Sequence, residues 1–159
     1  ALVKYVNEAL SEQKKKQQSP GEDDKSILYN DLDTESSDID KEYEINKQVF
    51  QKLDSLIKRD ELYLSADLSR EDLVRMAHMN NTRFAKMIKE NTGTNLSGYI
   101  NELRLNHAIH LLKEHPEYTL RAIAEASGIN SMPTFHSLFK NKTGMTSSEF
   151  KKTQMDMKQ

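Results

Sequence analysis

The stretch FHSLFKNKTGMTSSEF (Phe135–Phe150) repeats, with substitutions, the stretch FAKMIKENTGTNLSGY (Phe84–Tyr99) that precedes it in the chain. Identical or similar residues recur at one spacing through both stretches, and a similar pairing continues upstream after one residue is added in the turn. The aligned pairs are Leu73 with Ile123, Val74 with Ala124, His78 with Gly128, Phe84 with Phe135, Ile88 with Phe139, Lys89 with Lys140, Gly93 with Gly144 and Tyr99 with Phe150. One structural unit is therefore expected twice.

Each copy is typical of a helix-turn-helix unit, in which a small turn residue lets the second helix cross the first. Ala124 followed by Gly128 fits this pattern, whereas His78 must adopt a turn conformation that glycine takes freely. One such unit also occurs in helical bundles that do not bind DNA. Two units joined by a helix of about 20 residues, roughly 30 Å long, match the spacing of about 34 Å between successive major-groove faces of B-DNA.

The spacing of apolar residues predicts an all-α fold of seven helices, with two helix-turn-helix subdomains joined by a long linker helix. Ser69 is the expected N-cap of the second helix, and Gly93 and Gly144 are expected to end the third and sixth helices. We expect Leu96, Ile100, Leu103, His107 and Leu111 to line the buried face of the linker helix. The expected helices cover residues 44–59, 69–77, 81–91, 95–115, 119–127 and 132–144, and a last helix begins at Thr146.

The charge is unevenly divided, although the net charge of the chain is only −2. Residues 1–44 carry six Lys and twelve Asp or Glu, whereas residues 45–159 carry 17 Lys or Arg and 13 Asp or Glu. Residues 1–44 are expected to form a short helix, with Leu2, Val6 and Leu10 on one stripe, and a flexible acidic linker. Residues 45–155 then form the double helix-turn-helix domain, divided into 45–93, the linker helix 95–115, and 118–155.

Several classes of protein are excluded by composition. The chain has no Cys, which excludes disulfides and thiolate metal sites, and it has no apolar run of about 18 residues that could span a bilayer. His107, His110 and His115 leave a metal site formally open, but His107 falls on the apolar stripe and the chain has no nucleophile or phosphate-binding loop motif. No metal, cofactor or catalytic site is therefore predicted. The apolar start at Ala1 suggests a fragment of a longer chain.

Three segments together resemble the DNA-binding domain of the AraC/XylS (arabinose-regulator) family of bacterial transcription factors: RLNHAIHLLKE, IAEASGI and FHSLFKNKTGMTSSEF. The resemblance covers about residues 45–153 and implies two helix-turn-helix subdomains that read consecutive major-groove segments. It also implies a separate sensor or dimerisation domain outside this chain. Departures from the family pattern are Ser147 in place of Pro, Ser137 in place of a basic residue, and Ile129 in place of an aromatic residue.

The third helix supplies the first set of candidate DNA contacts, because Phe84 and Ile88 point inward and leave the opposite face for the groove. Lys86 matches the base-reading basic position of the family, and Lys donates to guanine O6 and N7. Asn side chains pair with adenine, and the Thr methyl group meets that of thymine. The outward candidates are Asn81, Thr82, Arg83, Ala85, Lys86 and Lys89. The alternative is that its basic residues form only a solvated face.

The sixth helix supplies the second set, which has few charges and is expected to act mainly by apolar contact and shape. Its groove-facing candidates are Met132, Thr134, His136 and Ser137, and the candidates for phosphate contact are Lys140, Lys142 and the helix start at Thr146 and Ser147. Arg104 on the linker helix is expected to be structural, with phosphate contact as the alternative.

The sequence thus predicts a non-enzymatic transcription regulator that binds specific double-stranded DNA in the bacterial cytoplasm, without a membrane segment in this chain. RNA polymerase is left open as a partner. The alternative from another class is a helical protein-interaction module that does not bind DNA. These two differ in whether the chain has salt-dependent affinity for duplex DNA.

Overall fold

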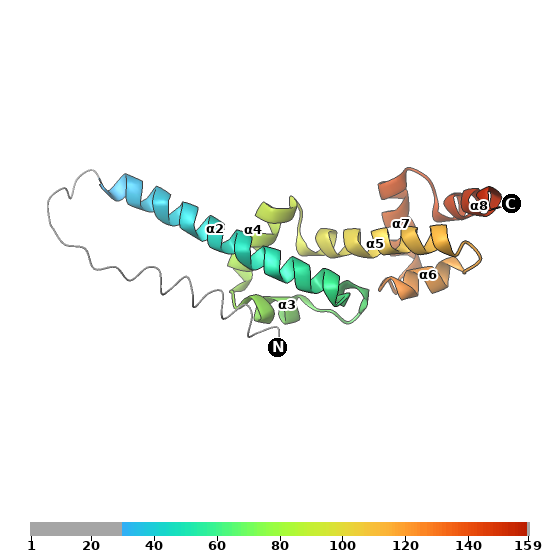
Figure 1. The fold of residues 1–159 in the computed structure, drawn as a ribbon, viewed down its shortest axis with the longest axis horizontal. Helices are drawn as coiled ribbons and strands as arrows, with labels where there is room; N and C mark the ends of the chain where they lie inside the picture. Colours follow the sequence, from blue (N-terminus) through green and yellow to red (C-terminus); the bar gives the residue numbers. More distant parts are fainter. Residues whose placement is uncertain (1–29, 159) are drawn as a thin grey trace. The chain divides into compact units, whose positions relative to one another are not determined.

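The computed structural model describes residues 30–158, with side chains from residue 37 onward, and over this range it is all-helical (Figure 1). The predicted short helix with Leu2, Val6 and Leu10 lies outside the described residues. Seven α-helices and one 3-10 turn follow in order. They are α2 (Asn30–Arg59), η1 (Leu62–Leu64), α3 (Arg70–Ala77), α4 (Asn81–Thr92), α5 (Leu96–Glu114), α6 (Leu120–Ala126), α7 (Met132–Thr143) and α8 (Ser147–Met157). The predicted all-α fold class is confirmed.

The chain divides into two compact units. The first contains α2 as far as Leu56 together with Ser69–Gly93, and the second contains Ile57–Leu68 and the chain from Thr94 onward. Each unit includes one helix-turn-helix pair, α3 with α4 in the first and α6 with α7 in the second. The helix α5, predicted as the linker, belongs to the second unit.

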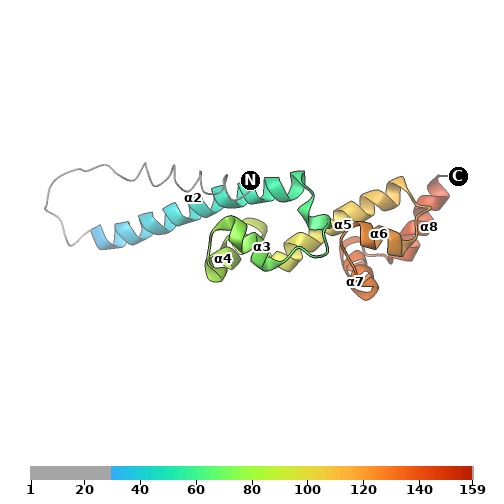
Figure 2. The same cartoon turned by 90° about the horizontal axis from the view of Figure 1, so that it is seen from below.

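The helices α2, α3 and α4 of the first unit lie beside one another (Figure 2), and each of them buries an apolar stripe. Phe84 and Ile88 of α4 are 0% and 1% exposed, as the sequence predicts, and Leu73 of α3 is 1% exposed. Leu53 of α2 is fully buried. The other buried apolar side chains of this unit are Val49, Phe50, Leu56, Ala77 and Met87.

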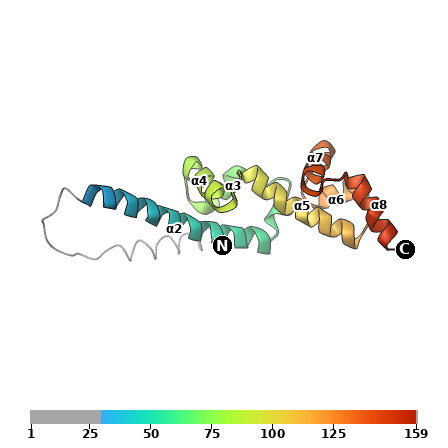
Figure 3. The same cartoon turned by 90° about the horizontal axis from the view of Figure 1, so that it is seen from above.

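The second unit packs α6, α7 and α8 against α5 (Figure 3). Phe135 and Phe139 of α7 are fully buried, with ring centroids 5.7 Å apart, and Phe150 of α8 meets Phe139 edge to face. The buried residues of this cluster are Leu105, Ala108, Leu112, Ile123, Ala124, Ile129, Phe135 and Phe139. The phenylalanines that mark the sequence repeat are therefore the centre of each core.

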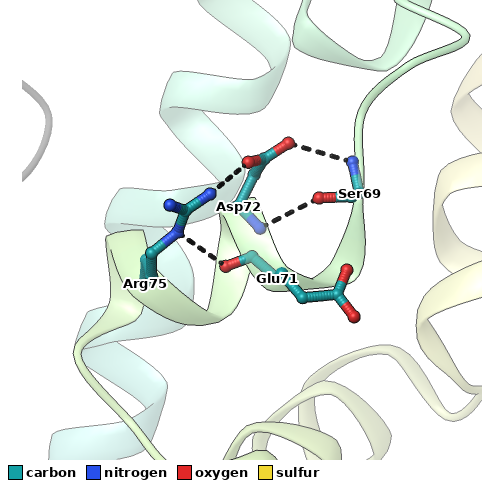
Figure 4. A network of polar contacts seen from close by, with 4 residues as sticks. All are labelled: Ser69, Glu71, Asp72 and Arg75. Carbon is teal, nitrogen blue, oxygen red and sulfur yellow. Dashed lines mark hydrogen bonds and ion pairs between the residues drawn. The ribbon is translucent and has the colours of Figure 1, made fainter.

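Helix ends follow the predicted capping residues. Ser69 Oγ accepts from Asp72 N while the Asp72 carboxylate accepts from Ser69 N, and Arg75 donates to Asp72 at 2.6 Å (Figure 4). These reciprocal bonds satisfy two donors at the start of α3 that the helix itself leaves unpaired. Gly93 and Gly144 end α4 and α7 in the left-handed conformation, with φ of 77° and 78°.

The start of α2 differs from the sequence prediction. The helix begins at Asn30 rather than near residue 44, so residues 30–44, for which a flexible linker was predicted, are helical. Once a helix has nucleated, each added turn costs little, and acidic side chains near its N-terminus interact favourably with the helix dipole. Residues 37–44 of α2 are nevertheless not part of the core, since Ile39 is 60% and Tyr43 is 43% exposed.

The buried face of α5 was also predicted only in part. Ile100 is buried, but Leu103, His107 and Leu111 are half-buried, and the deeply buried side chains of the second half are Leu105, Ala108 and Leu112. The helix is apolar on more than one side, so a single stripe cannot be chosen from spacing alone. Among the described residues, no helix is long and apolar enough to cross a membrane.

Candidate nucleic-acid interface

The exposed face of α4 carries the predicted contacts of the first unit. Asn80 caps the helix by accepting from Arg83 N at 2.8 Å, and buried Phe84, Met87 and Ile88 fix which side faces outward. The exposed residues of the opposite side are Asn81, Thr82, Ala85, Lys86 and Lys89. This face offers amide, methyl, hydroxyl and ammonium groups, which are the groups that recognise base edges in the major groove.

The two lysines of α4 differ in their contacts. Lys86 Nζ lies 3.9 Å from the Glu90 carboxylate, a long and exposed ion pair that holds it weakly. Lys89 Nζ donates to the carbonyl of Gly93 at 3.0 Å, at the C-terminal end of the helix. Lys86 is therefore the more available cation for a base, whereas Lys89 already completes the helix end.

Arg83 does not share this outward position. Its Nε donates to Asn46 Oδ1 at 2.9 Å and lies 3.7 Å from the Glu42 carboxylate, and both partners are on α2. The Arg83 side chain is only 32% exposed. The predicted solvent-facing Arg83 is thus a half-buried link between α4 and α2.

On α7 the predicted contacts separate into an exposed group and a group used inside the unit. Thr134, Ser137 and Lys140 are exposed, and Thr134 Oγ1 donates to Ser131 Oγ at 3.1 Å. Met132 is half-buried and packs against the core cluster of the second unit. The exposed candidates of α7 also include His136 and Lys142, so this helix presents two lysines, both near its C-terminal end.

The His136 ring connects α7 to the start of α8. Its Nδ1 is 2.7 Å from Ser147 Oγ, and Ser147 is fully buried. Thr146 caps α8 by accepting from Glu149 N at 3.2 Å, while Glu149 accepts from Thr146 N. The side chains of Ser147 and Thr146 are consequently occupied within the protein, which leaves the backbone of this helix start as the group able to meet a phosphate.

Lys142 near the end of α7 forms an ion pair with Glu102 of α5. The lysine was predicted as a phosphate contact, and its partner lies 40 residues away in sequence. A phosphate would have to displace this carboxylate.

Arg104 of α5 holds the segment around η1 by two hydrogen bonds. Arg104 Nε donates to the Tyr63 carbonyl at 2.6 Å, and its Nη2 donates to the Ser65 carbonyl at 2.8 Å. Gly128 lies against the same segment, because a Cβ at this position would stand 2.8 Å from Tyr63 O and 2.9 Å from Leu64 O. These contacts support the structural role expected for Arg104.

His107 lies beside this turn and takes part in internal contacts. Its Nδ1 is 3.2 Å from Ser127 Oγ, and its ring meets Tyr63 edge to face. Burial lowers the pKa of His107, partly offset by the Glu61 carboxylate, so the neutral ring is favoured. Within residues 30–158 no group of three His, Asp or Glu side chains is placed to hold a metal ion.

The geometry defines a helical protein with two helix-turn-helix units, and comparisons with known proteins agree. A family model described as a helix-turn-helix domain matches residues 73–153. YesN of Bacillus subtilis, named an uncharacterized transcriptional regulatory protein, is 38% identical over 80 residues, covering 50% of this chain and 22% of YesN. YobQ of the same organism, named an uncharacterized HTH-type transcriptional regulator, is 31% identical over 83 residues, covering 52% of this chain and 34% of YobQ.

Among solved structures, the C-terminal domain of AraT, a response regulator from Geobacillus stearothermophilus, has a TM-score of 0.58 and 21% identity, covering 66% of this chain and 84% of that structure. At this identity the likeness shows the fold alone. The chain belongs to the AraC/XylS (arabinose-regulator) family of helix-turn-helix, DNA-binding transcription regulators. It spans well under two thirds of either Bacillus relative. The alternative of a module that binds only proteins is not favoured.

The sequence did not predict that residues of α2 and α5 bind two of the candidate DNA-contacting side chains, Arg83 and Lys142. Asn46 could have been recognised from the sequence, because it lies three positions before Val49 and therefore on the same face of the helix. In the structure this polar residue is fully buried. Glu42 and Glu102 gave no local signal. Their partners Arg83 and Lys142 are remote in sequence, so only the folded chain brings these charges together.

Proposed function

We propose that this chain is the sequence-specific DNA-binding part of a non-enzymatic bacterial transcription regulator, and that α4 and α7 read two adjacent major-groove segments. The observation that carries this proposal is the repeated construction of the two helices. Each has 12 residues, begins after a polar N-cap whose side chain accepts from the backbone, buries a phenylalanine in its first turns, and ends at a left-handed glycine. Family membership supports DNA as the target.

The first unit is proposed to carry most of the base discrimination. Lys86 is assigned to guanine O6 and N7, Asn81 to adenine, and the Thr82 methyl to thymine, because these side chains are exposed on α4 and match those base edges. The small side chain of Ala85 allows α4 to approach the base edges of the major groove closely. Lys89 is assigned to a phosphate, since its ammonium group lies at the end of the helix.

The second unit is proposed to add register and shape recognition. Thr134, His136 and Ser137 offer short polar contacts, and Lys140 is assigned to a phosphate. Helix α5 has 19 residues and is about 28 Å long at about 1.5 Å per residue, close to the groove repeat of about 34 Å. This length supports two reading helices on one side of the duplex.

We further propose that a sensor or dimerisation domain outside this chain controls DNA binding, and that the protein works in the bacterial cytoplasm with RNA polymerase as a partner. YesN and YobQ both extend far beyond the part matched here. The AraT structure is the C-terminal domain of a response regulator, which supports an attached controlling domain.

Selection of binding sites from random duplexes tests the proposal. We expect enriched sites with two short conserved segments whose centres are about 10 to 10.5 base pairs apart. The logarithm of the affinity for these sites should fall linearly with the logarithm of salt concentration, because cations released from several phosphates accompany binding. Absence of affinity for any duplex at low salt would contradict the proposal and favour the protein-interaction module.

A further inference from the structure

The acidic N-terminal half of α2 meets the first reading helix through Arg83. The Arg83 backbone N–H donates to the capping Asn80, which places this residue in the first turn of α4. Its guanidinium reaches back to α2, donating to Asn46 Oδ1 at 2.9 Å and standing 3.7 Å from Glu42 Oε1. One cation therefore joins the start of the reading helix to two residues of α2.

Asn46 fixes the position of this guanidinium. The Asn46 side chain is fully buried, and among the described residues its Nδ2 group has no hydrogen-bond partner. Because arginine has only donors, the amide oxygen must face Arg83. A buried donor left unpaired is costly, so Asn46 is a poor choice for stability alone, and its side-chain oxygen is used to hold Arg83.

Glu42 contacts the same guanidinium more loosely. Its side chain is 44% exposed and the pair is 3.7 Å apart, which is typical of an ion pair that contributes little and exchanges readily. The surrounding segment 37–44 is acidic, with Asp38, Asp40 and Glu44 against the single Lys41, which pairs with Asp38 at 3.9 Å. A negatively charged surface thus stands beside a cation of the reading helix.

We propose that Glu42 competes with a DNA phosphate for Arg83, so that the acidic half of α2 restrains DNA binding by the first unit. This inference rests on the proposed function. Carboxylates and phosphates bind the planar guanidinium in the same way, and a phosphate at Arg83 would be repelled by the nearby Glu42 carboxylate, so each anion weakens the binding of the other. Asn46 holds the guanidinium beside Glu42, and the Arg83 side chain is 32% exposed, which leaves it open to an anion from outside the protein.

A conformational change that moves the N-terminal half of α2 away from α4 would remove this competitor. DNA affinity then rises without any change in the residues that read bases. Because α2 is continuous from Asn30 to Arg59, a signal delivered at its N-terminal end can reach Glu42 along one helix.

Glu42→Gln is the variant that tests the competition, because it removes the charge and leaves the buried Asn46 contact in place. With a selected duplex, we expect affinity to rise about two- to fivefold, the range of a single exposed ion pair. The slope of log affinity against log salt should steepen by up to about 0.9, the contribution of one additional phosphate contact. Glu44→Gln is the matched control, since Glu44 is exposed on the same helix and loses the same charge.

Adding Glu42→Gln to an Arg83→Gln variant tests whether the rise in DNA affinity depends on Arg83. Arg83→Ala would leave the buried Asn46 without its partner and could unfold the unit, whereas Arg83→Gln keeps an amide donor for it. Thermal unfolding monitored by circular dichroism checks that each variant is folded. Glu42→Gln in this background should no longer raise affinity.

Three results would overturn the inference. They are equal gains for Glu42→Gln and Glu44→Gln, an unchanged affinity of Glu42→Gln, and a full gain that persists in the Arg83→Gln background. The first would mean that only the overall charge matters. If wild type and every folded variant lack affinity for duplex DNA, both the proposed function and this inference are wrong. If wild type binds DNA but Glu42→Gln does not change the affinity, only this inference is wrong.

Discussion

In the first unit the turn residue is His78, exposed, with φ of 52° and ψ of 44°, whereas in the second unit it is Gly128, buried, with φ of 81°. The sequence repeat aligns these two residues, and the backbone at both is left-handed. Only the surroundings differ. Around Gly128 the carbonyl oxygens of Tyr63 and Leu64 leave no room for a Cβ.

The difference shows that the repeat preserves a backbone conformation, while local space decides which residue can adopt it. A left-handed conformation costs a non-glycine residue roughly 1–2 kcal/mol, which an exposed histidine can tolerate. At the buried turn a steric clash would be added to that cost. The two units therefore share the left-handed conformation at this turn position but not their tolerance of substitution there.

Gly128→Ala is expected to give the largest effect. Backbone strain and the clash with two carbonyl oxygens together should lower the free energy of unfolding by about 3 kcal/mol or more. Gly144→Ala is the matched control, because Gly144 has φ of 78° but no atom lies within 4 Å of the place where its Cβ would stand. Gly144→Ala should lower the free energy of unfolding by only about 1–2 kcal/mol. Urea unfolding measures both, and equal losses would show that crowding at Gly128 is unimportant.

Arg104→Ala should destabilise the second unit by about 2–3 kcal/mol, because two hydrogen bonds from a charged group to backbone carbonyls are lost. Arg104→Lys should retain part of this stability, since one ammonium group cannot reproduce the two-pronged contact. Thermal unfolding reports the ranking. Normal stability with a loss of DNA affinity would instead assign Arg104 to a phosphate.

Lys86→Ala sharpens the comparison of the two reading helices, since Ser137 of α7 is the residue aligned with Lys86. Lys86→Ala should relax discrimination at one base position by about 1–3 kcal/mol. Ser137→Ala should change discrimination by clearly less, because a hydroxyl offers a weaker contact than an ammonium group. Competition binding with single-base variants of the selected site measures this. Equal weakening on every sequence would make Lys86 a phosphate contact.

His78→Gly should have the smallest effect and the opposite sign. Relief of the left-handed strain outweighs the extra entropy of glycine in the unfolded chain, so stability should rise by up to about 1 kcal/mol. Urea unfolding measures the change. A loss of stability would mean that the His78 side chain makes a contribution beyond its backbone conformation.

Most helices of the fold were predictable because their ends are encoded locally. Ser69, Gly93 and Gly144 are capping residues, and the structure uses each of them at the predicted helix end. The start of α2 was not predictable from composition, since an acidic stretch that is too polar to fold alone can still extend a helix nucleated by the buried Leu53 region.

The candidate site was predictable only as far as the helical period reaches. Burial of Phe84 and Phe135 correctly oriented α4 and α7, so exposed positions such as Lys86 and Ser137 followed from spacing. The partners of Arg83 and Lys142 are 37 and 40 residues away in sequence, and no local pattern specifies such contacts. Their roles in DNA binding stay predictions.

The central claim is that two units read two groove segments together, and insertion of about 5 base pairs between the two subsites tests it most directly. Half of the roughly 10 to 10.5 base pairs of a helical turn rotates the second subsite to the far side of the duplex. Titrated at one salt concentration, the expanded site should bind several kcal/mol more weakly, with only salt-dependent, non-specific affinity remaining for the displaced unit. Equal affinities for the natural and expanded sites would contradict the claim and make the second unit structural.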